Sequence, residues 1–292
     1  MLSIVRVARG LTQATLAKES GVSQATLSKV ESGMMRLENE RLTKVADRLE
    51  VPPELLMQPS DFAGAPAIVF HRKRASLPVS AASRLRARLD LVHLQVEALV
   101  GEEVPVRLER RRLDSEGLTT PEEIAGQVRQ ALGLPRGPIR DLICSLESAG
   151  VVVVREDLGS VKIDALMSWR PSGRPIVLLG SHAPGDRQRF SVAHELGHAV
   201  MHELPTEDQE AQADRFASEL LLPRADVSGL LGDVSLARLA RLKQEWGVSM
   251  AAILRRAHDL GQISDFLYRR GNIELSQSGY RSREPVEIPP EG

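Results

Sequence analysis

Cysteine is almost absent from this chain, since Cys144 is the only one among 292 residues. A single cysteine excludes an intramolecular disulfide and a cluster of thiolate ligands, so any bound metal needs histidine and carboxylate ligands. Aromatic residues are also scarce, at 3% of the sequence. The hydrophobic cores must therefore be built mainly from aliphatic side chains.

Long hydrophobic runs are missing as well. No stretch of about 18 apolar residues occurs, which argues against a membrane span. The first segment, MLSIVRVARGLTQ, has arginines among its apolar residues and lacks the apolar core and cleavage site of a secretory signal. We therefore expect a cytoplasmic protein.

Neither sign of charge dominates the chain. Lys and Arg number 38 and Asp and Glu number 39, which gives a formal net charge of −1. This balance argues against a protein that coats nucleic acid with its whole surface. A small DNA-reading surface on one domain remains compatible with it.

The length suits two or three domains. Short helices separated by Gly, Ser and Pro fill the first sixty residues, and QPSDFAGAPA, residues 58–67, is typical of a linker. We expect a domain of five small helices at 1–58 and a connector at 59–119. Beyond the linker, a basic stretch that starts at His71 is followed by a helical pattern through Leu85, Leu89, Val92 and Val96. The simplest interpretation of this stretch is a solvated helix surface.

The helices of the first domain have clear start and stop signals. Thr12 can cap a helix that runs to Ser20, and Gly21 suits a turn with positive φ. Ser23 can cap the next helix, which Gly33 ends. Two helices joined by a tight turn predict a helix-turn-helix.

The outward face of the second of these helices is small and polar, as major-groove readout requires. Gln13, at the start of the preceding helix, is expected to meet a DNA phosphate. The alternative is a small helical bundle for protein contact. The candidate DNA-contacting residues are Thr12, Gln13, Ser23, Gln24, Ala25, Thr26, Ser28 and Lys29.

These residues resemble the XRE (Cro/C1-type) helix-turn-helix family from Leu2 to Met57, through the phrases TQxxLA and GVSQxTLSKxExG. One departure is the short first helix, which begins almost at the initiator methionine. The resemblance implies binding to a double-stranded DNA operator. It also implies a homodimer, since paired domains read symmetric half-sites.

The middle of the chain mixes helices with strands. Two helical segments, TPEEIAGQVRQALGLP and GPIRDLICSLESAG, come before strand patterns at 151–154, 160–169 and 175–180. The fold class expected for the whole chain is therefore mainly α with a small β-sheet, an α+β arrangement.

The segment RFSVAHELGHAVMHE contains the pattern H-E-x-x-H. His194 and His198 are four residues apart, so on a helix they project from one face and can bind one ion. Glu195 between them suits a general base that accepts a proton from the attacking water. The pattern predicts a catalytic zinc site, although a histidine-rich helix without a metal is the simpler alternative.

A catalytic zinc needs a third protein ligand. Glu210 lies three residues before Ala213, in register with the apolar stripe of the next helix. A carboxylate there is costly unless it is paired or bound to metal, so we predict Glu210 as that ligand. Asp214 and His202 are predicted to support the ligands. The alternatives are that Asp214 is a polar residue on the flank of its helix and, less favoured, that His202 is itself a ligand. His182 and His258 are read as surface or hydrogen-bonded histidines, or as stabilisers of an oxyanion.

RQRFSVAHELGHAVMH and EAQADRFASELLLP resemble the ImmA/IrrE family of zinc-dependent metallopeptidases. The resemblance covers about residues 120–225 and implies a zincin-like domain there, with His194, His198 and Glu210 as ligands and Glu195 as the base. Zinc is the implied metal, and another divalent ion such as Mn²⁺ is an alternative. A helical C-terminal extension with a loose tail is expected at 226–292.

The two resemblances together lead to two functional hypotheses. In the first, the chain is a DNA-binding transcriptional regulator whose zinc-dependent endopeptidase domain cleaves a protein partner, plausibly a repressor or other regulator, under conditional control. In the second, it is a non-proteolytic repressor or antitoxin-like regulator, and its metal domain senses a ligand or binds a toxin. The intact general base favours the first.

Overall fold

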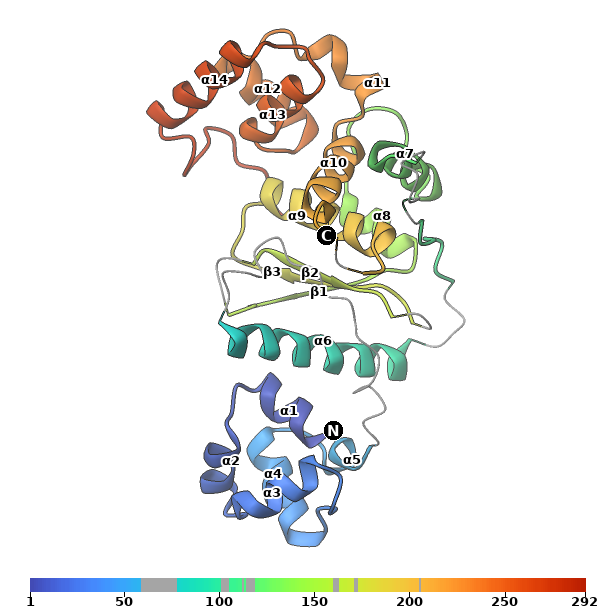
Figure 1. Cartoon of the computed structure of the whole chain (residues 1–292), viewed down its shortest axis with the longest axis vertical. Coiled ribbons are helices and arrows are strands. Elements are labelled where there is room, and N and C mark those ends of the chain that lie inside the picture. The colour runs from blue at the N-terminus through green and yellow to red at the C-terminus, as the bar shows by residue number, and fades with distance from the viewer. Residues whose placement is uncertain are drawn as a thin grey trace. The chain divides into compact units, whose positions relative to one another are not determined.

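The computed structural model describes residues 1–58, 78–100, 105–111, 113, 119–159, 163–170, 173–204 and 206–292. These residues divide into two compact units, one that holds the helices up to residue 100 and one that begins at residue 105 (Figure 1). Of the expected linker at 58–67, only Gln58 lies within the described residues. No helix in these ranges is long and apolar enough to cross a membrane.

The first unit contains the five small helices that the sequence predicts. They are α1 (Leu2–Ala8), α2 (Gln13–Ser20), α3 (Gln24–Glu31), α4 (Asn39–Leu49) and α5 (Pro53–Met57). Thr12 and Ser23 cap α2 and α3 with side-chain hydrogen bonds, and Gly21 adopts a φ of 70° between them. The predicted helix-turn-helix, α2 and α3, is therefore present.

A sixth helix completes this unit. α6 (Val79–Leu99) packs along α1, and its Leu91 contacts the core of the five small helices. That core is aliphatic, as the scarcity of aromatic residues requires, with Leu16, Leu27 and Val45 fully buried. The connector helix predicted from Leu85 to Val96 thus belongs to the first unit.

The second unit is built on a small mixed sheet. Its strands are β1 (Val152–Glu156), β2 (Ala165–Ser168) and β3 (Ile176–Gly180), in the order β1-β3-β2. β3 pairs with β1 in parallel and with β2 in antiparallel orientation. Every residue of β2 and β3 is buried, so these strands form the centre of the unit rather than its surface. The expected fold class, mainly α with a small sheet, is confirmed.

Four helices of the second unit come directly before and after the three strands. α7 (Pro121–Ala131) begins with a capping box between Thr120 and Glu123, and α8 (Leu142–Ser148) precedes β1. α9 (Gly185–Met201) packs on the sheet, and α10 (Gln209–Leu221) contacts both α9 and α7 (Figure 1). Because α9 and α10 lie side by side, residues from both can share one site.

The remaining helices continue the same core. They are α11 (Arg224–Val227), the 3-10 helix η3 (Ser228–Leu230), α12 (Leu236–Trp246), α13 (Met250–Asp259) and α14 (Asp265–Gln277). Apolar residues of α12 and α13 belong to one hydrophobic cluster with those of α9 and α10.

The last residues are attached to the second unit, so the expectation of a loose tail is wrong. Glu291 accepts hydrogen bonds from the backbone N–H groups of Leu142 (2.9 Å) and Ile143 (3.2 Å) and pairs with the buried Arg189. Glu284 accepts from Lys243 at 2.8 Å. The sequence predicts a loose tail because this segment is polar and rich in proline. In the structure, its carboxylates accept hydrogen bonds from Arg and Lys side chains and from the first N–H groups of a helix, all far away in the sequence.

Candidate metal centre and nucleic-acid interface

The side chains of the H-E-x-x-H pattern on α9 are buried in the interior of the second unit. His194, Glu195 and His198 have only 1%, 3% and 0% of their surface exposed. α9 is buried along most of its length because it lies between the sheet and α10. Polar groups buried this deeply require partners or a bound ion.

Glu210 of α10 meets both histidines. Its carboxylate oxygens lie 3.5 Å from His194 Nε2 and 3.3 Å from His198 Nε2, and the two Nε2 atoms are 3.1 Å apart. Donors about 2.0–2.1 Å from a tetrahedral zinc ion are spaced about 3.3 Å from one another. The three groups therefore fit a metal ion, and His194, His198 and Glu210 form a group that can hold one.

The outer nitrogen of His194 faces Asp214, one turn beyond Glu210. The two atoms are 2.8 Å apart, so the Nδ1–H donates to the carboxylate and the Nε2 lone pair is left for a metal. Burial lowers the pKa of His194, but hydrogen bonds with Asp214 and Glu210 and the nearby carboxylate charges raise that pKa to about 9. In the metal-free protein both ring nitrogens of His194 are therefore protonated at neutral pH, so a metal must replace the proton on Nε2.

The outer nitrogen of His198 begins a chain of hydrogen bonds. His198 Nδ1 lies 3.0 Å from His202 Nδ1, and His202 Nε2 lies 2.8 Å from Gln212 Oε1. An amide oxygen only accepts, so His202 carries its proton on Nε2 and accepts through Nδ1. His198 must then donate through Nδ1, which leaves its Nε2 lone pair directed at the metal position. Burial lowers the pKa of His202, which favours this neutral form.

Glu195 is the most enclosed acid of the group. Burial raises its pKa to about 8, with the His194 charge opposing and the Glu210 charge adding to the shift, while a hydrogen bond from the Met167 backbone lowers it. Among the described residues, no group hydrogen-bonds to its Oε2. A buried carboxylate oxygen without a partner is suited to hold a water or substrate proton.

Two of these partners escaped the sequence analysis. Gln212 is not a metal-ligand residue type, and its only sequence signal is its place between Glu210 and Asp214. Met167 acts through its backbone on β2, which no side-chain motif reveals. His182 and His258, two of the histidines outside the metal motif, each contact an acidic side chain. His182 lies 3.1 Å from Asp164, and His258 lies 2.7 Å from Asp265. The oxyanion role considered for them stays a prediction.

The nucleic-acid candidates lie in the first unit. Ser23, Gln24, Ala25, Ser28 and Lys29 are exposed on or beside α3, and Thr26 is half-buried. The hydroxyls of Thr12 and Ser23 accept hydrogen bonds from the N–H groups of Thr15 and Thr26. Their side chains therefore serve the helix ends as well as any DNA contact.

Gln13 has a partner inside the protein. Its side-chain amide donates to Glu31 at 2.8 Å, and Glu31 also accepts two hydrogen bonds from Arg6, at 2.6 and 2.9 Å. This cluster links α1, α2 and the end of α3. A phosphate contact by Gln13 stays a prediction.

Comparison with known protein families identifies both parts of the chain. Residues 2–56 match the helix-turn-helix family model, and residues 146–258 match the IrrE N-terminal-like domain. The second match begins within α8 and ends within α13, so it includes α9 and α10. No curated protein matches the chain. The chain therefore combines an XRE-type helix-turn-helix domain with an IrrE N-terminal-like domain of the M78 peptidase family.

Proposed function

We propose that this protein is a DNA-binding transcriptional regulator that carries a zinc-dependent endopeptidase. The observation that supports it best is the convergence of His194, His198 and Glu210 beside Glu195, whose Oε2 has no hydrogen-bond partner among the residues that the structure describes. In the proposed division, 1–58 reads DNA, 59–119 connects, 120–225 holds the peptidase and 226–292 extends it. A cytoplasmic protein fits both roles.

The metal group is proposed to consist of three ligands and two supports. His194, His198 and Glu210 hold the ion, while Asp214 and His202 orient the imidazoles through their outer nitrogens. When bound, a zinc ion supplies Lewis acidity that makes water acidic near neutral pH and polarises a peptide carbonyl. Zinc suits two imidazoles and a carboxylate, and Mn²⁺ remains the alternative.

Glu195 is proposed as the general base. Its buried carboxylate accepts a proton from the attacking water and returns it to the leaving amine, so one group serves both halves of peptide hydrolysis. The pKa of about 8 in the metal-free site shows how strongly the surroundings favour the protonated form. Once a divalent charge replaces the proton on His194, Glu195 ionises more readily. The substrate is proposed to be a regulatory protein, such as a repressor.

A mutation of the base tests the enzyme. We expect Glu195→Gln to retain zinc and to cleave at least about 100-fold more slowly than the wild type. The measurement is a lysate pull-down with the variant, followed by digestion of each captured protein with wild-type and variant enzyme. Glu287→Gln is the matched control, because it makes the same change at an exposed glutamate that pairs with Arg283. If wild type and Glu195→Gln leave every captured protein uncut while both hold zinc, the peptidase is excluded.

A second candidate function follows from the depth of the site. The two histidines and Glu195 are almost fully buried, and Glu210, with 41% of its side chain exposed, is the most open member. A metal group this deeply buried also suits a metal domain that senses a ligand or binds a toxin, in a repressor or antitoxin-like regulator without proteolysis. The same pull-down separates the two functions, because a toxin partner is captured equally by both forms and stays intact.

The DNA-binding role is proposed for α3 and the starts of α2 and α3, in a homodimer. Thr12, Gln13, Ser23, Gln24, Ala25, Thr26, Ser28 and Lys29 are the proposed contact residues. The exposed Gln24 and Lys29 carry the clearest test. We expect replacing both with alanine to weaken binding to a duplex selected from a random pool by at least about tenfold.

The exposed Lys44 of α4 provides the control, because Lys44→Ala removes one charge that pairs with Glu40 outside the helix-turn-helix. Affinity that is unchanged in the Gln24 and Lys29 double variant contradicts the assignment of α3.

A further inference from the structure

The last helix, α14, carries apolar side chains that its own unit leaves exposed. Phe266 and Ile273 have 71% and 57% of their surface exposed, and Leu267 has 37%. Apolar residues that are exposed singly are ordinary on protein surfaces, whereas a group of them on one helix is typical of an interaction surface. Among the described residues, nine large apolar side chains are exposed, and three of these lie on α14.

Two of these side chains lie on the same side of the helix. Phe266 and Ile273 are seven residues apart, so they lie two turns apart in one line along α14. Arg269 and Arg270 lie between them, one on each flank, and we call these four residues the α14 face. The opposite side of α14 packs on α13 and α12, and Figure 1 shows the helix at the outside of the second unit.

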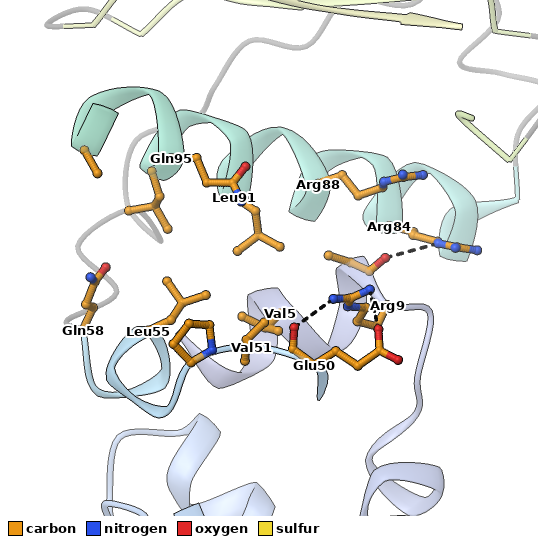
Figure 2. Close-up of a pocket in the computed structure, with 14 residues that line it drawn as sticks. Val5, Arg9, Glu50, Val51, Leu55, Gln58, Arg84, Arg88, Leu91 and Gln95 are labelled. Atoms are coloured by element: carbon orange, nitrogen blue, oxygen red, sulfur yellow. Dashed lines mark hydrogen bonds and ion pairs between the residues drawn. The ribbon is translucent and has the colours of Figure 1, made fainter. Parts of the chain in front are cut away.

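The long helix α6 of the first unit uses its apolar residues differently. Figure 2 shows Leu91 of α6 directed toward Val5 and Val51, across a pocket of about 570 Å³ in the same unit. The large apolar residues that α6 exposes, Val79 and Leu99, lie at its two ends, about 30 Å apart along the helix axis. They cannot form one patch, so α14 is the better candidate for an interface.

The charges of α14 favour a second copy of the same helix over a strongly charged partner. Its two arginines are balanced by Asp265 and Glu274, so the helix itself offers no net attraction to DNA or to an anionic membrane. Arg270 and Glu274 lie one turn apart on the same flank and form an ion pair at 2.8 Å. When two copies of the helix pack in antiparallel orientation, the same flanks meet, and each Arg270 can face Glu274 of the second chain.

The same register brings the apolar residues together. The two-fold axis then passes near Asn272, midway between Arg270 and Glu274, so the two Ile273 side chains meet beside the axis. Phe266 covers the C-terminal end of the other helix. A register that sets Phe266 on Ile273 of the second chain instead brings all four arginines of the two faces to the axis, where like charges repel.

We propose that the α14 face is a dimer interface, covered by α14 of a second copy in antiparallel orientation about a two-fold axis. The contact joins two helix-turn-helix domains in one particle, as the reading of paired half-sites requires. This role in DNA reading rests on the proposed DNA-binding function, whereas the contact itself does not.

The size of the α14 face sets the expected affinity. A helix of 13 residues is about 20 Å long and about 10 Å wide. Such a face is smaller than the roughly 800 Å² that each partner buries in a stable complex. We therefore expect a reversible dimer with a Kd on the order of 10–100 µM, which two half-sites on one duplex strengthen.

Sedimentation equilibrium of the full chain, without DNA, tests the interface. Ile273→Ser is expected to weaken dimerisation at least about tenfold, because a symmetric interface loses the side chain twice. Leu204→Ser is the matched control, since Leu204 is an exposed aliphatic residue outside α14, and its dimer should match that of the wild type. A wild type that stays monomeric up to about 1 mM overturns the proposal. So does a folded Ile273→Ser variant that dimerises like the wild type.

Charge reversal tests whether the partner is a second copy. Arg270→Glu and Glu274→Arg are each expected to weaken dimerisation about 3- to 10-fold, because like charges then face one another. An equal mixture of the two variants should form a heterodimer about as tightly as the wild type forms its dimer, since both contacts between the chains again join opposite charges. If mixing restores no dimer, the antiparallel pairing is overturned.

The role in DNA reading is measured separately, with the duplex selected by the full chain. Ile273→Ser is expected to weaken binding to a duplex with two half-sites at least about fivefold and to leave binding to one half-site unchanged. If the chain dimerises through α14 but selects no duplex, the DNA-binding function fails and the interface stands. If a duplex is selected and Ile273→Ser binds it as tightly as the wild type, the role of α14 in DNA reading is overturned.

Discussion

At the scale of single residues, the metal group is organised by the atoms that face away from the metal position. Asp214 accepts the proton of His194 Nδ1, and His202 accepts that of His198 Nδ1. Each contact fixes a proton on Nδ1, so Nε2 is the nitrogen that can bind an ion. The ligand residues alone do not determine which nitrogen is available, so the supporting residues are part of the site.

The His202 and Gln212 contacts should therefore control metal affinity. We expect His202→Ala and Gln212→Leu each to weaken zinc binding about 10- to 100-fold, because the His198 tautomer is no longer defined. Competition with a fluorescent zinc chelator measures this directly. Gln212→Glu should retain most of the affinity, since a carboxylate also accepts from His202 Nε2. An equal loss in Gln212→Leu and Gln212→Glu would point to packing instead.

The stability of the metal-free protein should depend on pH. The pKa of His194 rises from 6.5 to about 9 and that of Glu195 from 4.5 to about 8 on folding. A raised pKa gives stability that is complete below the unfolded value and is lost as pH rises through the folded value. The free energy of unfolding should therefore fall between pH 4.5 and about 8 through Glu195 and between pH 6.5 and about 9 through His194.

Urea unfolding in EDTA across this range measures the effect. Zinc should remove most of it, because the metal replaces the proton on His194. Asp214→Asn removes one of the groups that raise the His194 pKa, so the decline in stability should be smaller and should end at a lower pH. A metal-free protein that is equally stable, or more stable, at the alkaline end contradicts the prediction.

At the scale of elements, the distance between α9 and α10 decides whether Glu210 reaches the two histidines. Gly197 lies between the ligands on α9, and a Cβ built on it would be 2.8 Å from the Phe216 ring of α10. A side chain at this position would push the two helices apart. Glycine is thus needed here for close helix packing, although it weakens an isolated helix.

Two glycines inside helices should respond to alanine in opposite ways. Gly197→Ala is expected to destabilise the protein by about 1–3 kcal/mol because of the contact with Phe216. Gly126→Ala in α7, which has nothing within 4 Å of the added Cβ, should stabilise it by about 0.5–1 kcal/mol through helix propensity. Denaturant unfolding and zinc affinity measure both. Equal behaviour of the two variants contradicts the packing argument.

At the scale of the whole molecule, the C-terminal tail forms hydrogen bonds and ion pairs with elements that are far apart in sequence. Glu291 connects the first turn of α8 with Arg189 of α9, and Glu284 connects Lys243 with the start of α13. Arg189, Glu291 and Lys243 have side chains that are at most 10% exposed. Buried charges of this kind depend on one another.

Loss of one tail carboxylate should therefore be costly. Glu291→Ala leaves the buried Arg189 with backbone carbonyl acceptors only and without its carboxylate partner. It also leaves two helix N–H groups without their acceptor, and we expect a loss of about 3–5 kcal/mol. Glu287 in the same tail pairs with Arg283 on the surface, where both side chains are at least 77% exposed. Glu287→Ala should change stability by less than about 0.5 kcal/mol. Similar unfolding curves for the two variants would indicate that the contacts of Glu291 do not stabilise the protein.

The sequence by itself determined the features that depend on local spacing. Helix caps at Thr12 and Ser23, the Gly21 turn and the pair His194 and His198 follow from neighbours within about one turn, where backbone geometry is nearly invariant. These features are sufficient to predict five small helices, a small sheet and a histidine pair on one helix face. Glu210 was predicted from the cost of a carboxylate in an apolar register, and its place beside both histidines agrees.

Only the tertiary structure decided the partners that come from distant segments. The Met167 backbone beside Glu195, Gln212 behind His202, and Glu291 on Arg189 leave no periodic signal, because their contacts depend on how separate elements pack. Local geometry thus specified the reactive residues, and packing specified their surroundings, which set the pKa values and tautomers on which their chemistry depends.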